Sequence, residues 1–268
     1  MLRQGKTSTL EAEVWYFPGE GEDADSPYLE GPISSKAQTL KAKYFFRPTE
    51  LHGQKAWKAV IPEPCLWSIQ NPAIYALNGH APLIGLRDLR VRGESFYQED
   101  RRWVVRAARG SYRNDKELIA NAITPIHRRG DLAYIDSGNI AGLPLIVWPD
   151  GYPQIEIERL SRSAAVLMLV LPSDSSLEII AEAHSHLLLG AEISPGKPTP
   201  DWAKFAVVSE DLIHANWQPE RRLPVVVTRQ LDAGVLSGEE VRAHCDKFQA
   251  SLKNGAEFAG LWLMWEPS

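Results

Sequence analysis

Six carboxylates follow apolar runs of the sequence and could act as acids or bases. They are Asp136, Asp150, Glu192, Glu210, Asp211 and Glu266. Glu192, within Leu-Leu-Gly-Ala-Glu-Ile-Ser, and Glu266, directly after Trp265, have mainly apolar neighbours. Because burial disfavours an ionised carboxylate, such surroundings raise its pKa and suit it to proton transfer. Carboxylates at strand ends also cap helices and form ion pairs, so we expect most of the six to be structural.

Tryptophan is the second residue type that points to chemistry. The chain has 9 tryptophans, and aromatic surface of this kind lines sugar sites as well as ordinary cores. Trp148, Trp262 and Trp265 accompany apolar runs and could form a floor on which a sugar stacks. Trp262 and Trp265 are three residues apart, so in a strand they face opposite sides. At most one of these two can then point into a barrel.

His184 and His186 form a His-x-His pair, which can place two imidazoles on one metal ion when the segment is extended. We expect the pair at the N-terminal end of a strand, the side of a barrel that serves stability. No third ligand is evident, so the sequence predicts no metal site and no cofactor. The sequence also lacks a Gly-x-Ser-x-Gly nucleophile elbow and a glycine-rich phosphate loop.

The elements that must position these residues change in kind near residue 100. Before it, short runs with alternating apolar residues are separated by Gly, Pro and Asp, which predicts an antiparallel β-sandwich. The runs are 10–17, 38–46, 56–61 and 73–77. After it, nearly continuous apolar runs indicate parallel strands buried on both faces. The predicted strands are 103–107, 132–135, 143–148, 165–171, 187–193, 205–208, 223–228 and 258–265.

Helical patterns lie between several of these strands. Residues 116–129 have an apolar face that Pro125 should kink, and Ser237 with Glu240 forms a capping box. Eight strands alternating with helices predict a (β/α)8 barrel of the TIM type. Its roughly 165 residues are fewer than the ~250 of a typical barrel, so we expect short or missing helices after the second, fifth and sixth strands. An open doubly wound sheet is the alternative, which the missing phosphate loop disfavours.

Composition and charge exclude several classes of protein. Lys and Arg number 29 against 34 Asp and Glu, a net charge of −5 that gives no basic field for nucleic acid. Cys65 and Cys245 are too few for a disulfide scaffold and fit a reducing compartment. The polar residues 1–10 predict no signal peptide, and the longest apolar run, 164–171, is too short to cross a membrane. We therefore expect a cytoplasmic protein without nucleic-acid or membrane partners.

Residues 61–77 read Ile-Pro-Glu-Pro-Cys-Leu-Trp-Ser-Ile-Gln-Asn-Pro-Ala-Ile-Tyr-Ala-Leu, and Gly85-Leu86-Arg87 and the segment 96–106 follow. The first segment resembles the Pro-x-Leu-Trp-Ser-x-x-Asn-Pro-x-Leu-Tyr-x-Leu segment of glycoside hydrolase family 2, the β-galactosidase and β-glucuronidase family. The other two resemble that family's Gly-Phe-Arg strand and the strand pair that enters its barrel. The resemblance covers about residues 55–110. It implies an immunoglobulin-like β-sandwich over residues 1–98, followed by a shortened (β/α)8 barrel over residues 99–268.

The same resemblance implies where catalysis should take place. In the family, glutamates at the ends of the fourth and seventh barrel strands act as acid and nucleophile. Here Asp174 takes the place of the acid, with Ser173 where the family has Asn, and Arg229 falls where the nucleophile should be. A guanidinium cannot attack an anomeric carbon, and it opposes an oxocarbenium-like transition state. Gln230 is not a nucleophile, and Asp232 lies further into the loop.

The sequence therefore predicts a glycoside hydrolase-like protein that is catalytically degenerate and has a carbohydrate-binding or scaffold role. One alternative is an active glycosidase with a rearranged carboxylate pair, drawn from Asp174, Glu192, Glu210 and Glu266. Another is an unrelated barrel enzyme with a small metabolite as substrate.

A carbohydrate ligand would bind at the C-terminal mouth of the barrel. We expect Trp148 or Trp265 as the stacking surface, Glu210 as a further substrate-binding residue, and Arg229 pointing into the mouth toward an anionic group of the sugar. Trp67 and Tyr75 should be buried, and residues 85–106 should couple the two domains. Strand faces that short helices leave uncovered would be covered by the sandwich or by a second copy in a homodimer.

Overall fold

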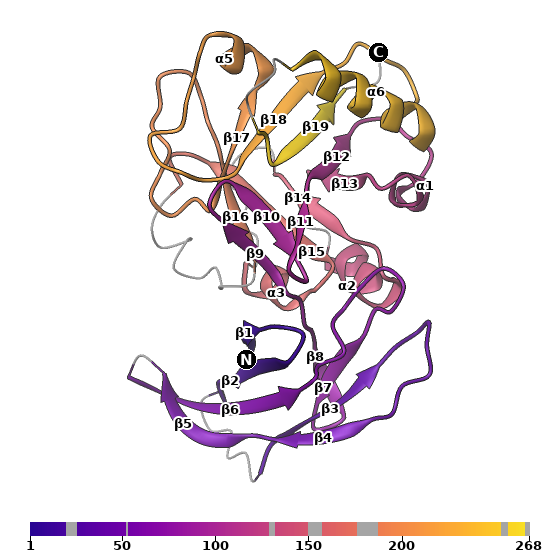
Figure 1. Cartoon of the computed structure of the whole chain (residues 1–268). Helices are drawn as coiled ribbons and strands as arrows, with labels where there is room; N and C mark the ends of the chain where they lie inside the picture. The colour runs from indigo at the N-terminus through magenta and orange to yellow at the C-terminus, as the bar shows by residue number, and fades with distance from the viewer. Residues whose placement is uncertain are drawn as a thin grey trace.

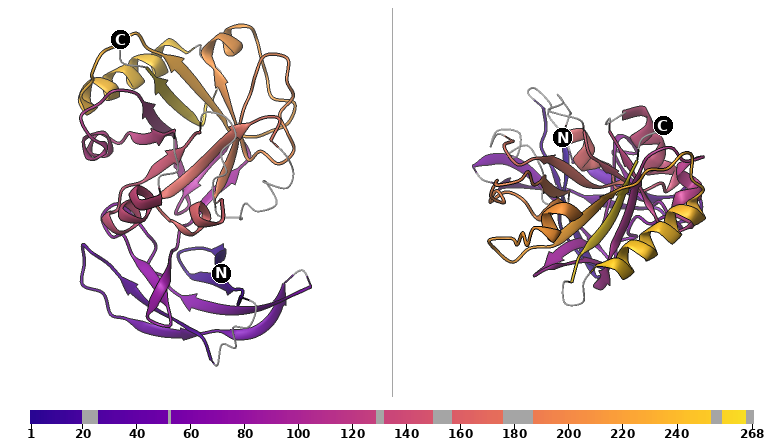
Figure 2. Two further views of the ribbon diagram at one scale, coloured as in Figure 1. Left: turned by 180° about the vertical axis from the view of Figure 1, so that it is seen from behind. Right: turned by 90° about the horizontal axis from the view of Figure 1, so that it is seen from above.

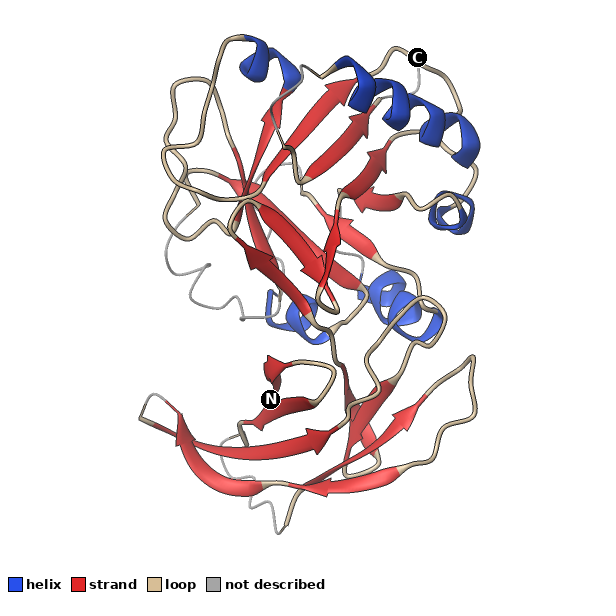
Figure 3. Ribbon diagram, in the orientation of Figure 1, coloured by secondary structure: helices blue, strands red, loops and turns tan. Residues whose placement is uncertain are grey.

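The computed structural model describes residues 1–19, 26–51, 53–128, 132–149, 157–175, 187–252 and 257–265. Two antiparallel sheets form an N-terminal sandwich, and a closed barrel of parallel strands follows (Figures 1 and 3). The fold class predicted from the sequence is thus confirmed. In the described part of the chain, no helix has the length and apolar character needed to span a membrane.

Each sheet of the sandwich has four strands. The first has the order β1–β2–β6–β5, with β1 (Leu2–Thr7), β2 (Glu11–Tyr16), β5 (Arg47–Leu51) and β6 (Gln54–Pro62). The second has the order β4–β3–β7–β8, with β3 (Tyr28–Ile33), β4 (Ala42–Phe45), β7 (Ile74–Leu77) and β8 (His80–Gly85). Alternate residues of β2, namely Ala12, Val14 and Tyr16, are buried in the core between the sheets. The period-two pattern of the sequence therefore marks the inner face correctly.

A small antiparallel sheet joins the sandwich to the barrel. It consists of β9 (Leu89–Arg92), β10 (Ser95–Gln98) and β11 (Arg101–Trp103). Phe96 of β10 is fully buried, and its ring meets the Phe205 ring edge-on at 5.3 Å inside the barrel. This sheet therefore closes the floor of the barrel. The domain boundary expected between residues 98 and 99 falls in the turn of its β10–β11 hairpin.

Two residues of the family-like segment hold the junction together. Trp67 is 1% exposed, and its Nε1 donates a hydrogen bond to the backbone oxygen of Asn139, in the barrel, at 2.7 Å. Tyr75 is fully buried between the sheets. The burial predicted for both residues is confirmed. Because Trp67 bonds directly to a barrel helix, it links the two parts of the chain.

The barrel has eight parallel strands, and the last pairs with the first. They are β12 (Val105–Arg109), β13 (Thr124–His127), β14 (Leu145–Val147), β15 (Val166–Pro172), β16 (Leu188–Glu192), β17 (Phe205–Ser209), β18 (Val225–Gln230) and β19 (Gly260–Met264). The described helices are α1 (Asp115–Ala120), α2 (Leu132–Ala141), α3 (Ile157–Arg162), α5 (Glu210–His214) and α6 (Gly238–Ser251). Figure 2 shows α6 lying along the outside of the barrel.

One strand was predicted in the wrong place. The second barrel strand is β13, inside the segment expected as a helix, and the segment 132–135 expected as a strand begins α2. The helical segment ends early because Ala122, with a φ of 57°, reverses the chain before Pro125. The strand count is still eight, so the fourth and seventh strands keep their positions.

The expected thinning of the helical layer is confirmed in part. No helix lies in the fully described segment between β16 and β17, and α5 after β17 has only 5 residues. After the second strand, however, α2 has 10 residues, so the expectation was wrong there. The capping box of Ser237 and Glu240 is present at the start of α6, as predicted.

Candidate functional site

The candidate site is the mouth of the barrel, at the C-terminal ends of the strands. The arrowheads of β17, β18 and β19 point away from the sandwich in Figure 1, so this mouth lies on the far side of the barrel from the sandwich. In β12, Val105 and Ala107 belong to the core inside the barrel. Ala108 belongs to the outer core, which is the apolar layer between the strands and helices such as α6. Arg109 therefore has the inward position at the end of this strand.

Three inward side chains form a continuous group across the mouth. Trp148, after β14, donates from Nε1 to Oε2 of Glu192, at the end of β16, at 3.1 Å. The guanidinium carbon of Arg109 lies 5.2 Å from the centroid of the Trp148 ring. These residues come from the first, third and fifth strands, and alternate strands supply one layer of a barrel interior. A cation, an indole and a carboxylate thus line the mouth side by side.

The lumen below this group is filled with aromatic rings. The Trp148 and Trp262 rings are 5.7 Å apart, and the Trp262 ring meets Phe205 at 6.2 Å. Gly190 makes room for this packing, since a Cβ there would lie 2.3 Å from the Phe205 ring. Over the described residues the barrel interior is therefore a packed core, so a ligand that enters the barrel binds at its mouth. Trp148 itself is 7% exposed, so its ring forms the floor of the mouth more than an open platform.

The predicted orientation of Arg229 is wrong. Val226 faces the lumen and Val227 the outer core, which places Thr228 and Gln230 inward and Arg229 outward. The Arg229 guanidinium lies 2.7 Å from Oε2 of Glu210 and 4.1 Å from the Phe248 ring of α6. It also donates to Oγ of Ser251 at 2.8 Å. Arg229 and Glu210 therefore form an ion pair on the outer wall.

The seventh strand presents Gln230 to the mouth instead. The β18–β19 register pairs Gln230 with Met264, and the β12–β19 register pairs Met264 with Arg109. Gln230 is exposed and level with Arg109. At the strand end where the resemblance to glycoside hydrolase family 2 implied a nucleophile, the inward side chain is thus an uncharged amide.

The fourth strand ends in a tight turn that carries Asp174. Ser175 donates from Oγ to the oxygen of Pro172 at 2.7 Å, and the Asp174 side chain within this turn is exposed. The β15–β16 register pairs Pro172 with Glu192, which is also exposed. Asp174 and Glu192 therefore emerge from neighbouring strand ends at the mouth.

Trp265 has a different environment from the one predicted. Its indole is 2% exposed and lies in the outer core, where Nε1 donates to the oxygens of Ser111 and Gly234 at 3.2 and 3.0 Å. Trp262 points into the lumen, so the prediction that at most one of the two faces inward is confirmed. Trp265 is closed off from the mouth, and among the described tryptophans discussed above Trp148 is the one that lines it.

The other carboxylates and the histidine pair fall in different places. Asp136 lies in α2 beside a cavity of about 270 Å³ under the barrel, because the strand expected before it is a helix. Asp211 is exposed in the first turn of α5. Within the described ranges, no three His, Cys, Asp or Glu side chains gather closely enough to hold a metal ion. The remaining candidates, Asp150, His184, His186 and Glu266, lie outside the described residues.

A further polar cluster at the strand ends was missed by the sequence reasoning. Oδ2 of Asp115 lies 2.9 Å from Nε2 of His127 and also accepts a hydrogen bond from the Tyr134 hydroxyl. The His127 and Tyr134 rings stack at 4.7 Å. Tyr112 lies near the same carboxylate, and burial together with the charge of Asp115 raises the pKa of its hydroxyl. The cluster fastens α1 and α2 to the second strand outside the lumen, and it was missed because that strand was expected as a helix.

Comparison with known proteins gives a match in fold. No family model matches the sequence, and no curated protein matches it. The β-glucuronidase from Ruminococcus gnavus in complex with D-glucuronic acid matches with a TM-score of 0.61 and 12% identity, over 98% of this chain and 59% of that chain. Its apo structure matches with the same score and identity, over 98% and 60%. The complex with uronic isofagomine matches with a TM-score of 0.60 and 11% identity, over 98% and 61%.

These matches concern architecture. The chain spans between 59% and 61% of the length of the β-glucuronidase structures that it matches. It has their fold over that length, as the resemblance to glycoside hydrolase family 2 implied. The TM-score of 0.61 establishes the shared fold, whereas an identity of 12% leaves the chemistry to be argued from the residues at the mouth.

Proposed function

We propose that this chain is a glycoside hydrolase-like protein whose barrel mouth binds an acidic sugar without hydrolysing it. The observation that carries the proposal is the end of the seventh strand. Thr228 and Gln230 face the mouth there, whereas Arg229 turns outward to Glu210. A retaining glycosidase needs an attacking carboxylate to form its glycosyl-enzyme intermediate. This strand supplies none.

The acidic character of the ligand is argued from Arg109. A guanidinium pairs with a carboxylate through two parallel hydrogen bonds, and Arg109 occupies the mouth beside Trp148. Glu192 next to them offers carboxylate oxygens to the hydroxyls of a sugar. The β-glucuronidase from Ruminococcus gnavus, which has this fold, is known in complex with D-glucuronic acid. Arg109 thus takes the place of Arg229 as the residue expected to bind the anionic group of the sugar.

Calorimetric titration with glucuronic acid and with glucose tests the proposal. We expect glucuronic acid to bind about tenfold or more tightly than glucose, because one charge-assisted hydrogen bond contributes about that much affinity. Arg109→Gln should remove the preference. Arg229→Gln is the matched control, since it removes an arginine from the outer wall and should leave the preference intact. Equal affinity for both sugars, or a preference that survives Arg109→Gln, would contradict the proposal.

One observation favours a second function, that of a glycosidase with a rearranged carboxylate pair. Asp174 and Glu192 leave neighbouring strand ends, and both are exposed at the mouth. An inverting enzyme needs one carboxylate as acid and another as base. Hydrolysis of aryl-glucuronides at neutral pH separates the two functions. Turnover that disappears in Asp174→Asn and in Glu192→Gln, but persists in the control Asp211→Asn, would establish the second function. We expect no turnover.

A further inference from the structure

A small cavity lies at the junction of sandwich and barrel, away from the mouth. Its volume is about 150 Å³, and part of its wall comes from the N-terminal ends of β13 and β15. The side chains that matter to its chemistry are Trp67, Arg87, Gln98, Trp103, Thr124 and Leu167. They come from both parts of the chain and from the hairpin between them. The cavity therefore lies between all three.

Arg87 is the charged residue of this wall. It is 9% exposed, and its guanidinium carbon lies 4.2 Å from the centroid of the Trp67 ring. Its backbone is clamped by Gln4, which donates to the Arg87 oxygen at 2.6 Å and accepts from the Arg87 nitrogen at 3.0 Å. The buried Nε atom has no hydrogen-bond partner among the described residues. Stacking on Trp67 thus holds the guanidinium at the junction, with one buried N–H donor unused.

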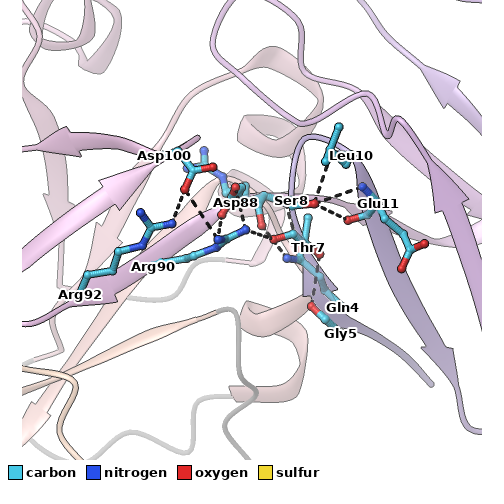
Figure 4. A network of polar contacts seen from close by, with 11 residues as sticks. Gln4, Gly5, Thr7, Ser8, Leu10, Glu11, Asp88, Arg90, Arg92 and Asp100 are labelled. Carbon is cyan, nitrogen blue, oxygen red and sulfur yellow. Dashed lines mark hydrogen bonds and ion pairs between the residues drawn. The ribbon is translucent and has the colours of Figure 1, made fainter.

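The acidic residues around Arg87 are engaged elsewhere. Figure 4 shows that Asp88 is held by Arg90, whose Nη2 donates to it at 3.0 Å, and that Asp100 is held by Arg92. Glu99 is the acid whose charge acts on Arg87, but it is exposed. Burial accordingly lowers the pKa of Arg87 to about 9. A buried cation without a buried counter-charge is strongly unfavourable, so the site calls for an anion.

We infer that this cavity binds a small oxyanion, a carboxylate or a phosphate, on the Arg87 guanidinium. The Gln98 amide and the Thr124 hydroxyl stand in the same wall and can donate to the remaining oxygens. The size is suitable, since an apolar cavity of roughly 150 Å³ holds a benzene molecule. The planar fork of arginine matches both planar and tetrahedral oxyanions. A bound anion would connect the sandwich, the hairpin and the barrel, and it would stabilise their junction.

Thermal unfolding of the full chain, followed by tryptophan fluorescence, tests the inference. The midpoint is measured in sodium chloride, sodium phosphate and sodium acetate at equal ionic strength and pH 7. A ligand that binds the folded state raises the midpoint in a saturable way, whereas excluded salts act without saturation. We expect a saturable rise with phosphate or acetate over chloride. The anion with the larger rise shows whether the site prefers a tetrahedral or a planar group.

Two variants and one control make the test specific. Arg87→Met should abolish the rise. Arg102→Met should keep the rise, because it removes an exposed arginine of the β10–β11 hairpin that pairs with Glu257. Because Arg87→Met can weaken folding, Gln98→Leu is titrated by calorimetry with inorganic phosphate and with acetate, and we expect binding weakened by about tenfold or more. No saturable rise in the wild type, or a rise that persists in Arg87→Met, would overturn the inference.

Discussion

Replacing Trp67 with alanine tests how firmly the sandwich is joined to the barrel. The indole is 1% exposed, its Nε1 bonds to the backbone of Asn139 at 2.7 Å, and the Arg87 guanidinium covers its face at 4.2 Å. One side chain thus contributes apolar burial, a hydrogen bond across the junction and a contact with a buried cation. Trp67→Ala removes all three.

The expected loss can be worked out by comparing two variants. Emptying a buried aromatic site costs about 3–5 kcal/mol, and the unpaired Asn139 oxygen puts Trp67→Ala near the upper end. Trp67→Phe keeps most of the ring and loses mainly the hydrogen bond, so it should cost about 1–2 kcal/mol. At about 2–4 °C per kcal/mol, Trp67→Ala should lower the melting temperature by about 10 °C or more.

Denaturant unfolding with circular dichroism and fluorescence as separate probes measures these losses. Trp217→Ala is the control, because Trp217 is half-buried in the loop after α5 and lines a different cavity from Trp67. It should cost less than Trp67→Ala. A free energy of unfolding that Trp67→Ala leaves unchanged would show that the indole is not buried in solution. Equal losses of unfolding free energy for Trp67→Phe and Trp67→Ala would refute the expectation that burial of the ring contributes more than its hydrogen bond.

Three other predictions concern the barrel. Gly190→Ala should cost about 1–3 kcal/mol of unfolding free energy, because the added Cβ overpacks against Phe205. Gly234→Ala is the control and should cost nothing measurable, because its Cβ would enter open space. Equal effects of the two substitutions would contradict a packed lumen. Arg229→Met should lower stability by about 1 kcal/mol through the loss of its Glu210 pair, and an unchanged denaturant midpoint would argue against that pair. Burial raises the pKa of the Cys245 thiol to about 12, so the thiol stays protonated at pH 8. In a Cys65→Ser variant, a thiol reagent should therefore label Cys245 only after unfolding. Rapid labelling of the native protein would contradict this expectation.

Much of the architecture could be predicted from the sequence because its signals are local. Seven of the eight barrel strands coincide with apolar runs, since parallel strands buried on both faces need apolar residues at nearly every position. Ser237 and Glu240 mark the start of α6 because a capping box needs only four successive residues. The segment 61–77 likewise indicates the sandwich and the buried Trp67 through its resemblance to glycoside hydrolase family 2.

The second strand could not be found in the same way. Thr124–His127 has only 4 residues and contains a proline, and its apolar residues also fit the helical pattern that precedes it. Its hydrogen-bond partners are β12 and β14, which lie on either side of it in the closed barrel. Closure of the barrel, and not local propensity, makes this segment a strand. The Asp115 and His127 cluster was missed with it.

The site itself was decided by tertiary structure. A strand buried on both faces carries apolar residues inward and outward alike, so no alternation in the sequence of β18 distinguishes lumen from outer wall. Only the closed barrel sends Gln230 to the mouth and Arg229 to Glu210. Arg109, Trp148 and Glu192 are far apart in the chain, and they meet because alternate strands of a barrel fill one layer of its interior. The sequence by itself determined most of the elements, with β13 and α2 as exceptions, whereas the closure of the barrel determined which of their side chains face one another.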